Sequence, residues 1–466
     1  MSGQTEPEKD QQRSEILTAP VTPLYMRMAI PIIFGLLVNG LYNFVDAIFI
    51  ARAVGADGIG GVSAAFPIHM VMISISAMMG SGMASVISRR LGAERDEEAS
   101  RIFSASLLLS ASVGVVLSIL VVSFCDPIFG LLGLPAAIHG YAVEYMLPIA
   151  MFSGISFSYG ILNESIRAQG RNVEVFKMML LSACLNIVLD AIFLFGFGWG
   201  VTGAAWATNI SIFAALLYAV KTLYSDNNRV HFKAEYFRFQ PEVHKEAVSL
   251  GIPVLMSYGG YALMLLVVNL AIVKVAPQEA DLLISAHGIL NRTLMLIFLP
   301  IIGMMIAFQT LAGFNYGAQI ESRVREGLKV ALWVSTGYSL LWTLVMVFIP
   351  QFLLMLFTDD AALLNRAVEI SQVVFLLFVT AGLTHICPAL FQAMGYAKHA
   401  AWLNALHTYV LLLPVLWLSI RTIGAEGLWW SFPILDGLTT VIITLFTLYF
   451  IKQLLPGGQP VAKSET

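Results

Sequence analysis

Charged residues are scarce in this chain. Only 12% of its 466 residues are Asp, Glu, Lys or Arg, whereas 58% are hydrophobic. A soluble globular domain carries roughly 25% charged residues. Half that share over so long a chain excludes a soluble protein and indicates a polytopic membrane protein. The net charge of -3 also argues against a nucleic-acid partner.

Cysteine and the common catalytic motifs are also scarce or missing. The three cysteines (Cys125, Cys184 and Cys387) lie in or beside apolar segments and lack zinc-site spacing, so neither a disulfide framework nor a zinc site is expected. No P-loop, HExxH or GxSxG occurs, which excludes an ATP-driven pump and argues against an enzyme. The first 20 residues hold no apolar signal-peptide core. We expect residues 1–22 to form a disordered cytoplasmic tail.

Long apolar stretches, by contrast, are abundant. A helix needs about 20 apolar residues to cross a bilayer, and twelve stretches meet this requirement. They cover residues 24–51, 60–88, 102–125, 141–167, 173–196, 201–222, 246–275, 282–310, 327–350, 366–394, 399–420 and 425–452. The sequence therefore predicts an all-α polytopic membrane protein with 12 transmembrane helices and no enzymatic activity.

The basic residues between these stretches predict the orientation. Of the 26 Lys and Arg residues, only four lie in the connections after odd-numbered helices: Arg52, Lys274, Arg366 and Arg421. Arg292 lies inside the eighth helix, and the others lie in or near the even-numbered connections and the tails. Because cytoplasmic connections are enriched in Lys and Arg, both termini are predicted to be cytoplasmic.

The two halves of the chain resemble each other. IPIIFGLLVNGLYNFVDAIFI opens the first half and GIPVLMSYGGYALMLLVVNLAIV the second, which aligns Pro31 with Pro253; RAQGRN and QAMGYA align Gly170 with Gly395. Each half holds six helices. We therefore expect two six-helix lobes related by a pseudo-twofold axis along the membrane normal. The predicted domains are an N-terminal lobe (23–222), a cytoplasmic linker (223–245), a C-terminal lobe (246–452) and a cytoplasmic tail (453–466).

Several motifs resemble one transporter family. LYNFVDAIFIARAVGADGIGGVSAAFP, SRRLGAERDEEASR, RAQGRN and LNIVLD, in this order over residues 22–452, resemble the multidrug and toxic compound extrusion (MATE) family. LYNFVD and LNIVLD together are similar to its DNA-damage-inducible protein F-like branch. The resemblance implies cation-coupled export by alternating access in the bacterial cell inner (plasma) membrane, with the chain acting as a monomer.

Acidic residues inside the spans are the strongest functional candidates, because a carboxylate at membrane depth is costly. Asn186 precedes Asp190 by four residues, on the same helix face. Asp190 and Thr208 are equally far from the turn near residue 199, and Asp46 lies at a comparable depth. We therefore predict one cluster formed by Asp46, Asn186, Asp190 and Thr208. The same four positions match the cation site in the N-terminal lobe of the family.

This cluster is predicted to carry the coupling ion. Two adjacent carboxylates cannot both ionise at low cost, so we expect them to share a proton. H⁺ is the favoured coupling ion and Na⁺ the alternative, since the same oxygen atoms are hard ligands. No cofactor is expected. In a purely structural interpretation, the cluster is a hydrogen-bond network that fixes helix packing.

The second half lacks an equivalent cluster. Asn269 occupies the seventh helix where the Na⁺-coupled branch of the family is expected to have an acid, and the tenth helix has Thr384 and His385 but no carboxylate. This departure argues against a cation site in the C-terminal lobe. We expect Arg292 and Asp436 to form a structural ion pair. The histidines within spans are expected to be packed and hydrogen-bonded: His69, His287, His385 and His407.

The residues leading to Asp46 suggest the substrate. The candidate binding residues are Asn39, Tyr42 and Asn43 on the first helix, Tyr159 and Asn163 on the fourth, and Met179 on the fifth. Aromatic and thioether groups around an acidic centre favour lipophilic cations. Pro31 removes one backbone hydrogen bond and is the candidate hinge of the first helix.

Two other functions are weighed against multidrug export. A flippase for lipid-linked saccharides needs a basic cavity to hold pyrophosphate, whereas Arg292 is nearly the only cation within the spans. A channel or membrane enzyme suits the twofold repeat and the absent motifs less well. The sequence thus predicts an antiporter that exports lipophilic organic cations in exchange for protons.

Overall fold

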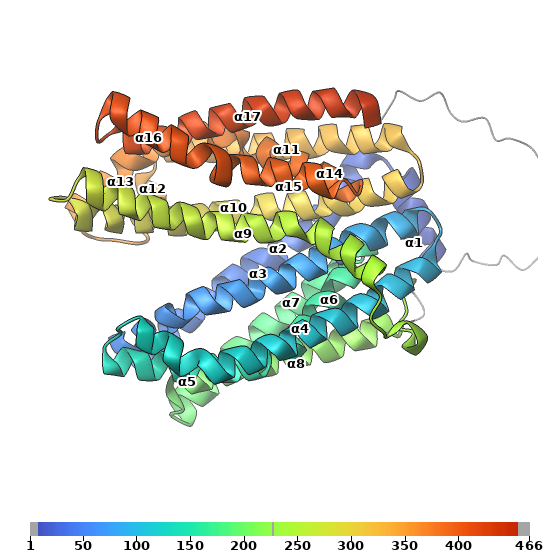
Figure 1. The fold of residues 1–466 in the computed structure, drawn as a ribbon, viewed down its shortest axis with the longest axis horizontal. Coiled ribbons are helices and arrows are strands. Elements are labelled where there is room, and N and C mark those ends of the chain that lie inside the picture. Colours follow the sequence, from blue (N-terminus) through green and yellow to red (C-terminus); the bar gives the residue numbers. More distant parts are fainter. Residues whose placement is uncertain (1–7, 226–227, 455–466) are drawn as a thin grey trace, which may run out of the picture. The chain divides into compact units, whose positions relative to one another are not determined.

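The computed structural model describes residues 8–225 and 228–454, and all regular secondary structure within these ranges is helical (Figure 1). The helices of the first half, which include one π-helical segment (η1), are α1 (Glu8–Thr18), α2 (Val21–Ala53), α3 (Ala56–Gly92), α4 (Asp96–Leu131), α5 (Ala136–Met151), α6 (Ser153–Ala168), α7 (Asn172–Asp190), η1 (Ala191–Gly196) and α8 (Gly200–Leu223).

The second half follows a short 3₁₀ turn, η2 (Ala234–Tyr236), and includes a second π-helical segment, η4. Its elements are α9 (Pro241–Val275), α10 (Ala280–Gly317), α11 (Glu321–Phe348), α12 (Gln351–Leu354), α13 (Ala361–Val374), η3 (Phe378–Thr380), α14 (Ala381–Ala393), α15 (Ala397–Ala405), η4 (Leu406–Leu411), α16 (Leu412–Ile423) and α17 (Gly427–Leu454).

The predicted number of spans agrees with the structure. Among the described residues, 10 helices are long and apolar enough to cross a membrane, and two bent pairs raise the number to 12. The predicted spans 141–167 and 366–394 correspond to these pairs, which bend by 55° and 54°. At the first bend, the hydroxyl of Ser153 donates to the Gly114 carbonyl at 2.6 Å. This bond ties the bend to α4.

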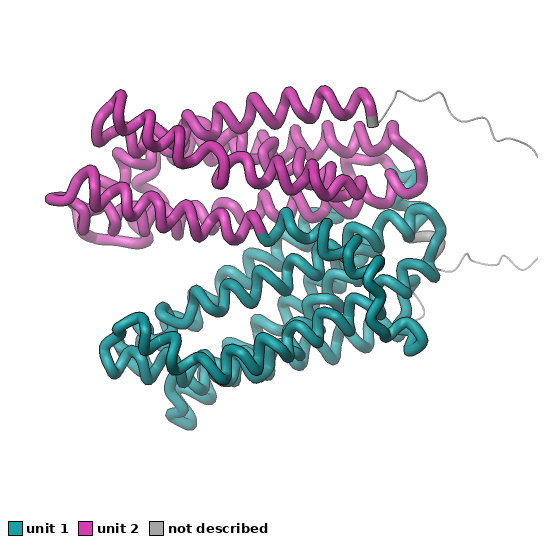
Figure 2. Tube along the Cα trace, viewed as in Figure 1, with its two compact units in different colours: residues 1–19, 27–255 teal, residues 20–26, 256–466 magenta. Residues whose placement is uncertain are grey.

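The chain forms two compact units (Figure 2). Unit 1 comprises residues 1–19 and 27–255, and unit 2 comprises residues 20–26 and 256–466. The boundary predicted at residue 246 therefore lies inside α9, whose first part packs within unit 1. The start of α2 belongs to unit 2 in turn, where the Tyr25 hydroxyl donates to the Met304 carbonyl at 3.0 Å.

Small residues let α3 and the first part of α9 pack closely within unit 1. A Cβ atom on Gly82 of α3 would overlap the Ala247 carbonyl oxygen of α9. A Cβ atom on Gly251 of α9 would likewise overlap the Met78 carbonyl oxygen of α3. Membrane helices gain no hydrophobic energy from packing in lipid, so close backbone approach at small residues stabilises such pairs. Both glycines are therefore needed for this packing.

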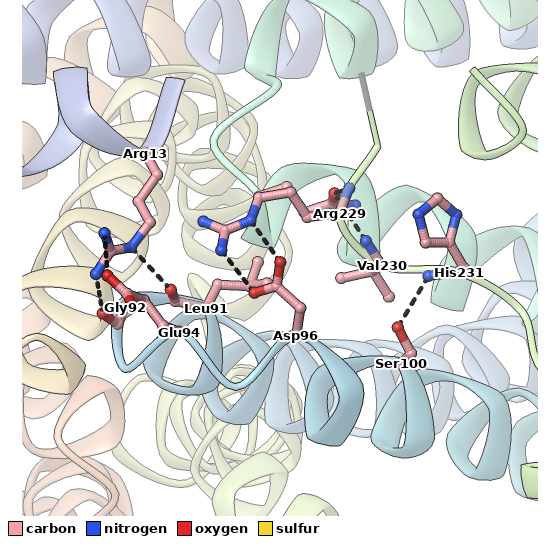
Figure 3. Close-up of polar contacts among 10 residues, drawn as sticks. Arg13, Leu91, Gly92, Glu94, Asp96, Ser100, Arg229, Val230 and His231 are labelled. Carbon is pink, nitrogen blue, oxygen red and sulfur yellow. Dashed lines mark hydrogen bonds and ion pairs between the residues drawn. The ribbon is translucent and has the colours of Figure 1, made fainter. Parts of the chain in front are cut away.

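The N-terminal region differs from its prediction. Residues 8–18, expected to belong to a disordered tail, form α1. Arg13 of α1 donates to the Gly92 carbonyl at 2.9 Å and pairs with Glu94 at 2.8 Å (Figure 3). The last carbonyl groups of a helix lack partners within it, so the guanidinium satisfies the end of α3 and fixes α1. The prediction of disorder is wrong for 8–18, whereas 1–7 lie outside the described residues.

The predicted linker follows one face of α4 (Figure 3). Asp96, Ser100 and Ser104 recur every four residues and so share a helix face. Asp96 accepts two bonds from Arg229, at 2.7 and 2.8 Å. Ser100 and Ser104 accept from the backbone amides of His231 and Lys233, at 3.1 and 3.0 Å. These contacts hold the linker against unit 1.

Candidate functional site

Asp46 and Asp190 lie together in unit 1. Asp46 is on α2 and 9% exposed, and Asp190 is the fully buried last residue of α7. Their carboxyl groups lie within hydrogen-bonding reach of each other. The two acids that the sequence singled out in this half are thus direct neighbours.

The oxygen atoms of this pair lack hydrogen-bond donors. Among the described residues, no donor reaches Asp46 Oδ1, either carboxyl oxygen of Asp190, or Asn186 Oδ1, and all four atoms are buried. Two ionised carboxylates only accept hydrogen bonds, so they cannot satisfy each other. A proton on either carboxyl group turns one acceptor into a donor. The arrangement is therefore chemically suited to holding a proton.

Asn186 and Thr208 extend the pair. Asn186 is buried on α7, and its amide donates to the Thr208 hydroxyl of α8 at 3.4 Å. Asp190 follows Asn186 by one helical turn. The four residues offer only oxygen ligands, which suit a hard cation such as Na⁺ as well as a proton. No group of three or more His, Cys, Asp or Glu in the described part of the chain is arranged to hold a metal ion.

A π-helical segment directly after Asp190 was not predicted. η1 (Ala191–Gly196) continues α7, and Phe193 within it stacks on Trp199 with ring centroids 4.8 Å apart. Gly198 and Gly200 have φ angles of 67° and 60°, which a residue with a side chain rarely adopts. π-Helical turns are frequent at functional sites. The GFGWG motif in the sequence indicates the turn, but no sequence period indicates a π-helix.

Two tyrosines lie within electrostatic range of the acidic pair. Tyr42 lies within electrostatic range of Asp46, Asp190 and Tyr159. Tyr145 of α5, 7% exposed, lies within range of the same two acids and of Tyr42. Sequence analysis missed Tyr145. In the sequence, Tyr145 is simply a tyrosine in an apolar stretch. Its approach to the acids depends on the bend between α5 and α6, which the sequence does not indicate.

The other candidate binding residues are less closely connected to the acids. The Asn163 amide donates to the Tyr159 hydroxyl at 3.2 Å, which links both to Tyr42. Met179 of α7 lies against α2 at Gly35. Asn43 is exposed, and its amide donates to the Asn39 carbonyl of its own helix at 2.7 Å. The substrate contacts of all six residues stay predictions.

The candidate hinge at Pro31 lies within a continuous helix. α2 is helical from Val21 to Ala53 and passes through Pro31 without a break. The proline supplies no amide hydrogen to the helix at this position. A hinge motion there stays a prediction.

The predicted ion pair between Arg292 and Asp436 is wrong. Asp436 of α17 pairs with His407 of η4, with Nε2 3.1 Å from Oδ1. Arg292 is exposed and forms no ion pair within the described ranges. The physical reason is that η4 and α17 pack against each other, so the imidazole meets the carboxylate first.

The histidines at 287 and 385 have the packed environment that was predicted. His287 Nδ1 lies 3.2 Å from Asn269 Oδ1, and its Nε2 lies 3.1 Å from the Asn291 amide nitrogen. His385 Nδ1 lies 2.9 Å from the Ala381 carbonyl oxygen. Asn269, noted above for replacing an acid, is thus part of a hydrogen-bond network with His287 and Asn291.

Comparison with known proteins identifies the family to which the chain belongs. The MatE family model matches residues 31–192 and 253–418, one segment in each half of the chain. The chain is 26% identical over 443 residues to the multidrug export protein MepA of Staphylococcus aureus (strain MRSA252), covering 94% of this chain and 96% of the relative. It is 24% identical over 437 residues to the protein of the same name from Staphylococcus saprophyticus.

Solved structures share the fold. One is an outward-facing multidrug resistance MATE family transporter of the MOP superfamily, with a TM-score of 0.88 and 24% identity. Another is a MOP superfamily transporter from Pyrococcus furiosus, described as having a binding pocket of reverse polarity, with a TM-score of 0.87 and 24% identity. Each likeness covers 97% of this chain and 99% of the other. From the family model and this shared fold, the chain belongs to the MatE family, a family of membrane transporters and not of enzymes.

Proposed function

We propose that this protein is a multidrug efflux antiporter that exports lipophilic organic cations in exchange for protons. The observation that carries the proposal is the cluster of buried carboxyl oxygens without donors at Asp46 and Asp190. The staphylococcal relatives, named multidrug export proteins, support export as the direction of transport. The protein then acts as a monomer in the bacterial plasma membrane, with both termini cytoplasmic.

Proton exchange follows from the chemistry of the pair. A shared proton neutralises one carboxyl group and bridges the two by a hydrogen bond. A bound organic cation supplies the positive charge instead, so the pair can lose its proton and remain compensated by the charge of the drug. Proton and drug therefore compete for one site, which is the basis of exchange between them. Asp46 and Asp190 thus hold the exchanged proton between them.

Selectivity for cations follows from the surroundings. Tyr42 and Tyr145 place aromatic rings within electrostatic range of the acids, and Tyr159 lies near Tyr42; such rings attract cations to their faces. An anion in the same place would meet like charge without a partner, which costs several kcal/mol. A saccharide flippase, which must hold a pyrophosphate, is disfavoured for the same reason.

The test is drug transport in proteoliposomes with one gradient imposed at a time. We expect a pH gradient alone to drive ethidium transport and a Na⁺ gradient alone to be ineffective. Asp46→Asn should abolish transport at normal expression, whereas Asp57→Asn, which removes an exposed acid, should leave it intact. Transport driven by Na⁺ alone, or full transport by Asp46→Asn, would overturn the proposal.

A further inference from the structure

Unit 2 contains a second pair of titratable groups within the spans. His407 of η4 and Asp436 of α17 lie 3.1 Å apart, and their side chains are 27% and 29% exposed. The other imidazole nitrogen of His407 lies 3.3 Å from the Thr408 hydroxyl. The proposed exchange of proton and drug at Asp46 and Asp190 does not use this pair.

The pair lies well inside two candidate membrane spans, 397–423 and 427–453. His407 follows the start of α15 at Ala397 by 10 residues, and Asp436 follows the start of α17 at Gly427 by nine. At 1.5 Å per residue, these are about 15 and 14 Å from the starts of the two helical segments, compared with a hydrocarbon layer roughly 30 Å thick. Ionisable groups at this depth are costly and are by default functional.

His385 of α14 adds a second imidazole. Its Nδ1 donates to the Ala381 carbonyl, which leaves Nε2 as the basic nitrogen of the neutral ring. The ring lies edge-on to Phe298, with centroids 4.7 Å apart, and within electrostatic range of His407 and Asp436. Tyr409, the titratable neighbour on η4 itself, donates its hydroxyl to the Met256 carbonyl. Among the described residues, Asp436 contacts His407 and His385 lies within electrostatic range of both.

The pair is not a copy of the acidic cluster in unit 1. The repeat aligns Pro31 with Pro253 and Gly170 with Gly395, so the counterparts of Asp46 and Asp190 are Val268 and Val415. Both are apolar. His407 nevertheless lies in a π-helical segment, η4, as Asp190 lies directly before η1. Each unit therefore has a titratable pair at an irregular helix turn, built from different residues.

We propose that His407 and Asp436, with His385 beside them, form a second proton-binding site, one that takes up and releases a proton in each transport cycle. This inference rests on the proposed proton-coupled function. A neutral imidazole beside a carboxylate has a net charge of -1, and binding one proton from water makes the pair neutral overall. Release returns that proton to water on the other side of the membrane. Imidazole suits this task because its ordinary titration range covers physiological pH.

The test is the steady ethidium gradient that a fixed pH gradient sustains in proteoliposomes with the membrane potential clamped to zero. Each coupled proton multiplies this gradient by about tenfold per pH unit, since 1.4 kcal/mol corresponds to tenfold. We expect His407→Gln and Asp436→Asn each to lower the final ethidium gradient about tenfold per pH unit, because each variant loses one coupled proton. A structural role would slow the approach to the gradient without changing its final size, and that result would overturn the inference.

A matched control and a second measurement separate this inference from the proposed function. His287→Gln alters a histidine of the same unit that is bonded only to amide groups, and it should leave the final gradient unchanged. Acid–base titration of purified protein should show that His407→Gln binds fewer protons than the wild type. This count needs no transport. An unchanged count overturns the second site, whereas unimpaired transport by Asp46→Asn overturns the proposed function alone.

Discussion

At the scale of single residues, the decisive feature is a charge that no neighbour compensates. Asp46 and Asp190 are buried, adjacent and without donors among the described residues. Removing one acid should therefore change selectivity more than folding. Asp190→Asn replaces a carboxylate with an amide that can donate to Asp46, and it lowers the negative charge of the site.

We expect wild-type protein to bind a lipophilic cation more tightly at pH 8 than at pH 5, because protons compete for the acids at low pH. It should bind a cationic dye at least tenfold more tightly than an anionic dye of equal size. Asp190→Asn should reduce this preference. Titration of both dyes onto purified protein at the two pH values measures each effect. Equal affinity for both dyes in the wild type would contradict the prediction.

At the scale of elements, close packing and the linker contacts stabilise unit 1. The linker contacts include two ion pairs, because Arg229 pairs with Asp96 and Lys233 donates to Glu97. The packing of α3 against α9 instead depends on missing side chains at Gly82 and Gly251. The two kinds of contact should respond differently to substitution, salt and pH.

Gly251→Ala should destabilise the protein, because the new Cβ atom would overlap a backbone carbonyl that cannot rotate away. Overpacking of this kind costs about 1–3 kcal/mol. Gly337→Ala in α11 is the matched control, since its Cβ atom would meet no atom within 4 Å, and alanine favours the helix. Thermal unfolding in detergent measures both variants. Equal melting temperatures for the two would refute the role of Gly251.

Arg229→Gln should loosen the linker, which amide hydrogen exchange of residues 228–240 would detect. Arg238→Gln, which changes an exposed linker residue, should not. High salt should also weaken the more exposed of the two ion pairs, which joins Lys233 to Glu97.

The pH response of the linker follows from Lys233. The hydrogen bond that Lys233 donates to Glu97 raises the pKa of the lysine. Its stabilising contribution is therefore fully present below the ordinary lysine pKa, about 10.4, and is lost as the pH rises through the raised value. Exchange at the Lys233 end of the linker should be the same at pH 6 and pH 8 after correction for the intrinsic rate. A difference between these values would contradict this assignment.

At the scale of the whole molecule, the distribution of Lys and Arg predicts the orientation. Lys398 and Glu426 are exposed and lie near opposite ends of the segment formed by α15, η4 and α16. Single cysteines at these positions, in a chain whose own cysteines are replaced by serine, should react differently with an impermeant maleimide. Glu426→Cys should react in intact cells and Lys398→Cys only after permeabilisation. The reverse pattern would show that the predicted orientation in the membrane is wrong.

The sequence by itself was enough to predict the class of protein, the number of spans and the family, because hydropathy and motif order are local properties of the chain. It also pointed to Asp46, Asn186, Asp190 and Thr208, since helical spacing and distance from a turn determine depth. Tertiary structure decided which side chains meet. The bends after Met151 and Val374, the π-helical turns and the partner of Asp436 depend on contacts between helices far apart in the sequence. For that reason, spacing within one helix predicted the acid cluster but missed Tyr145 and the pairing of His407 with Asp436.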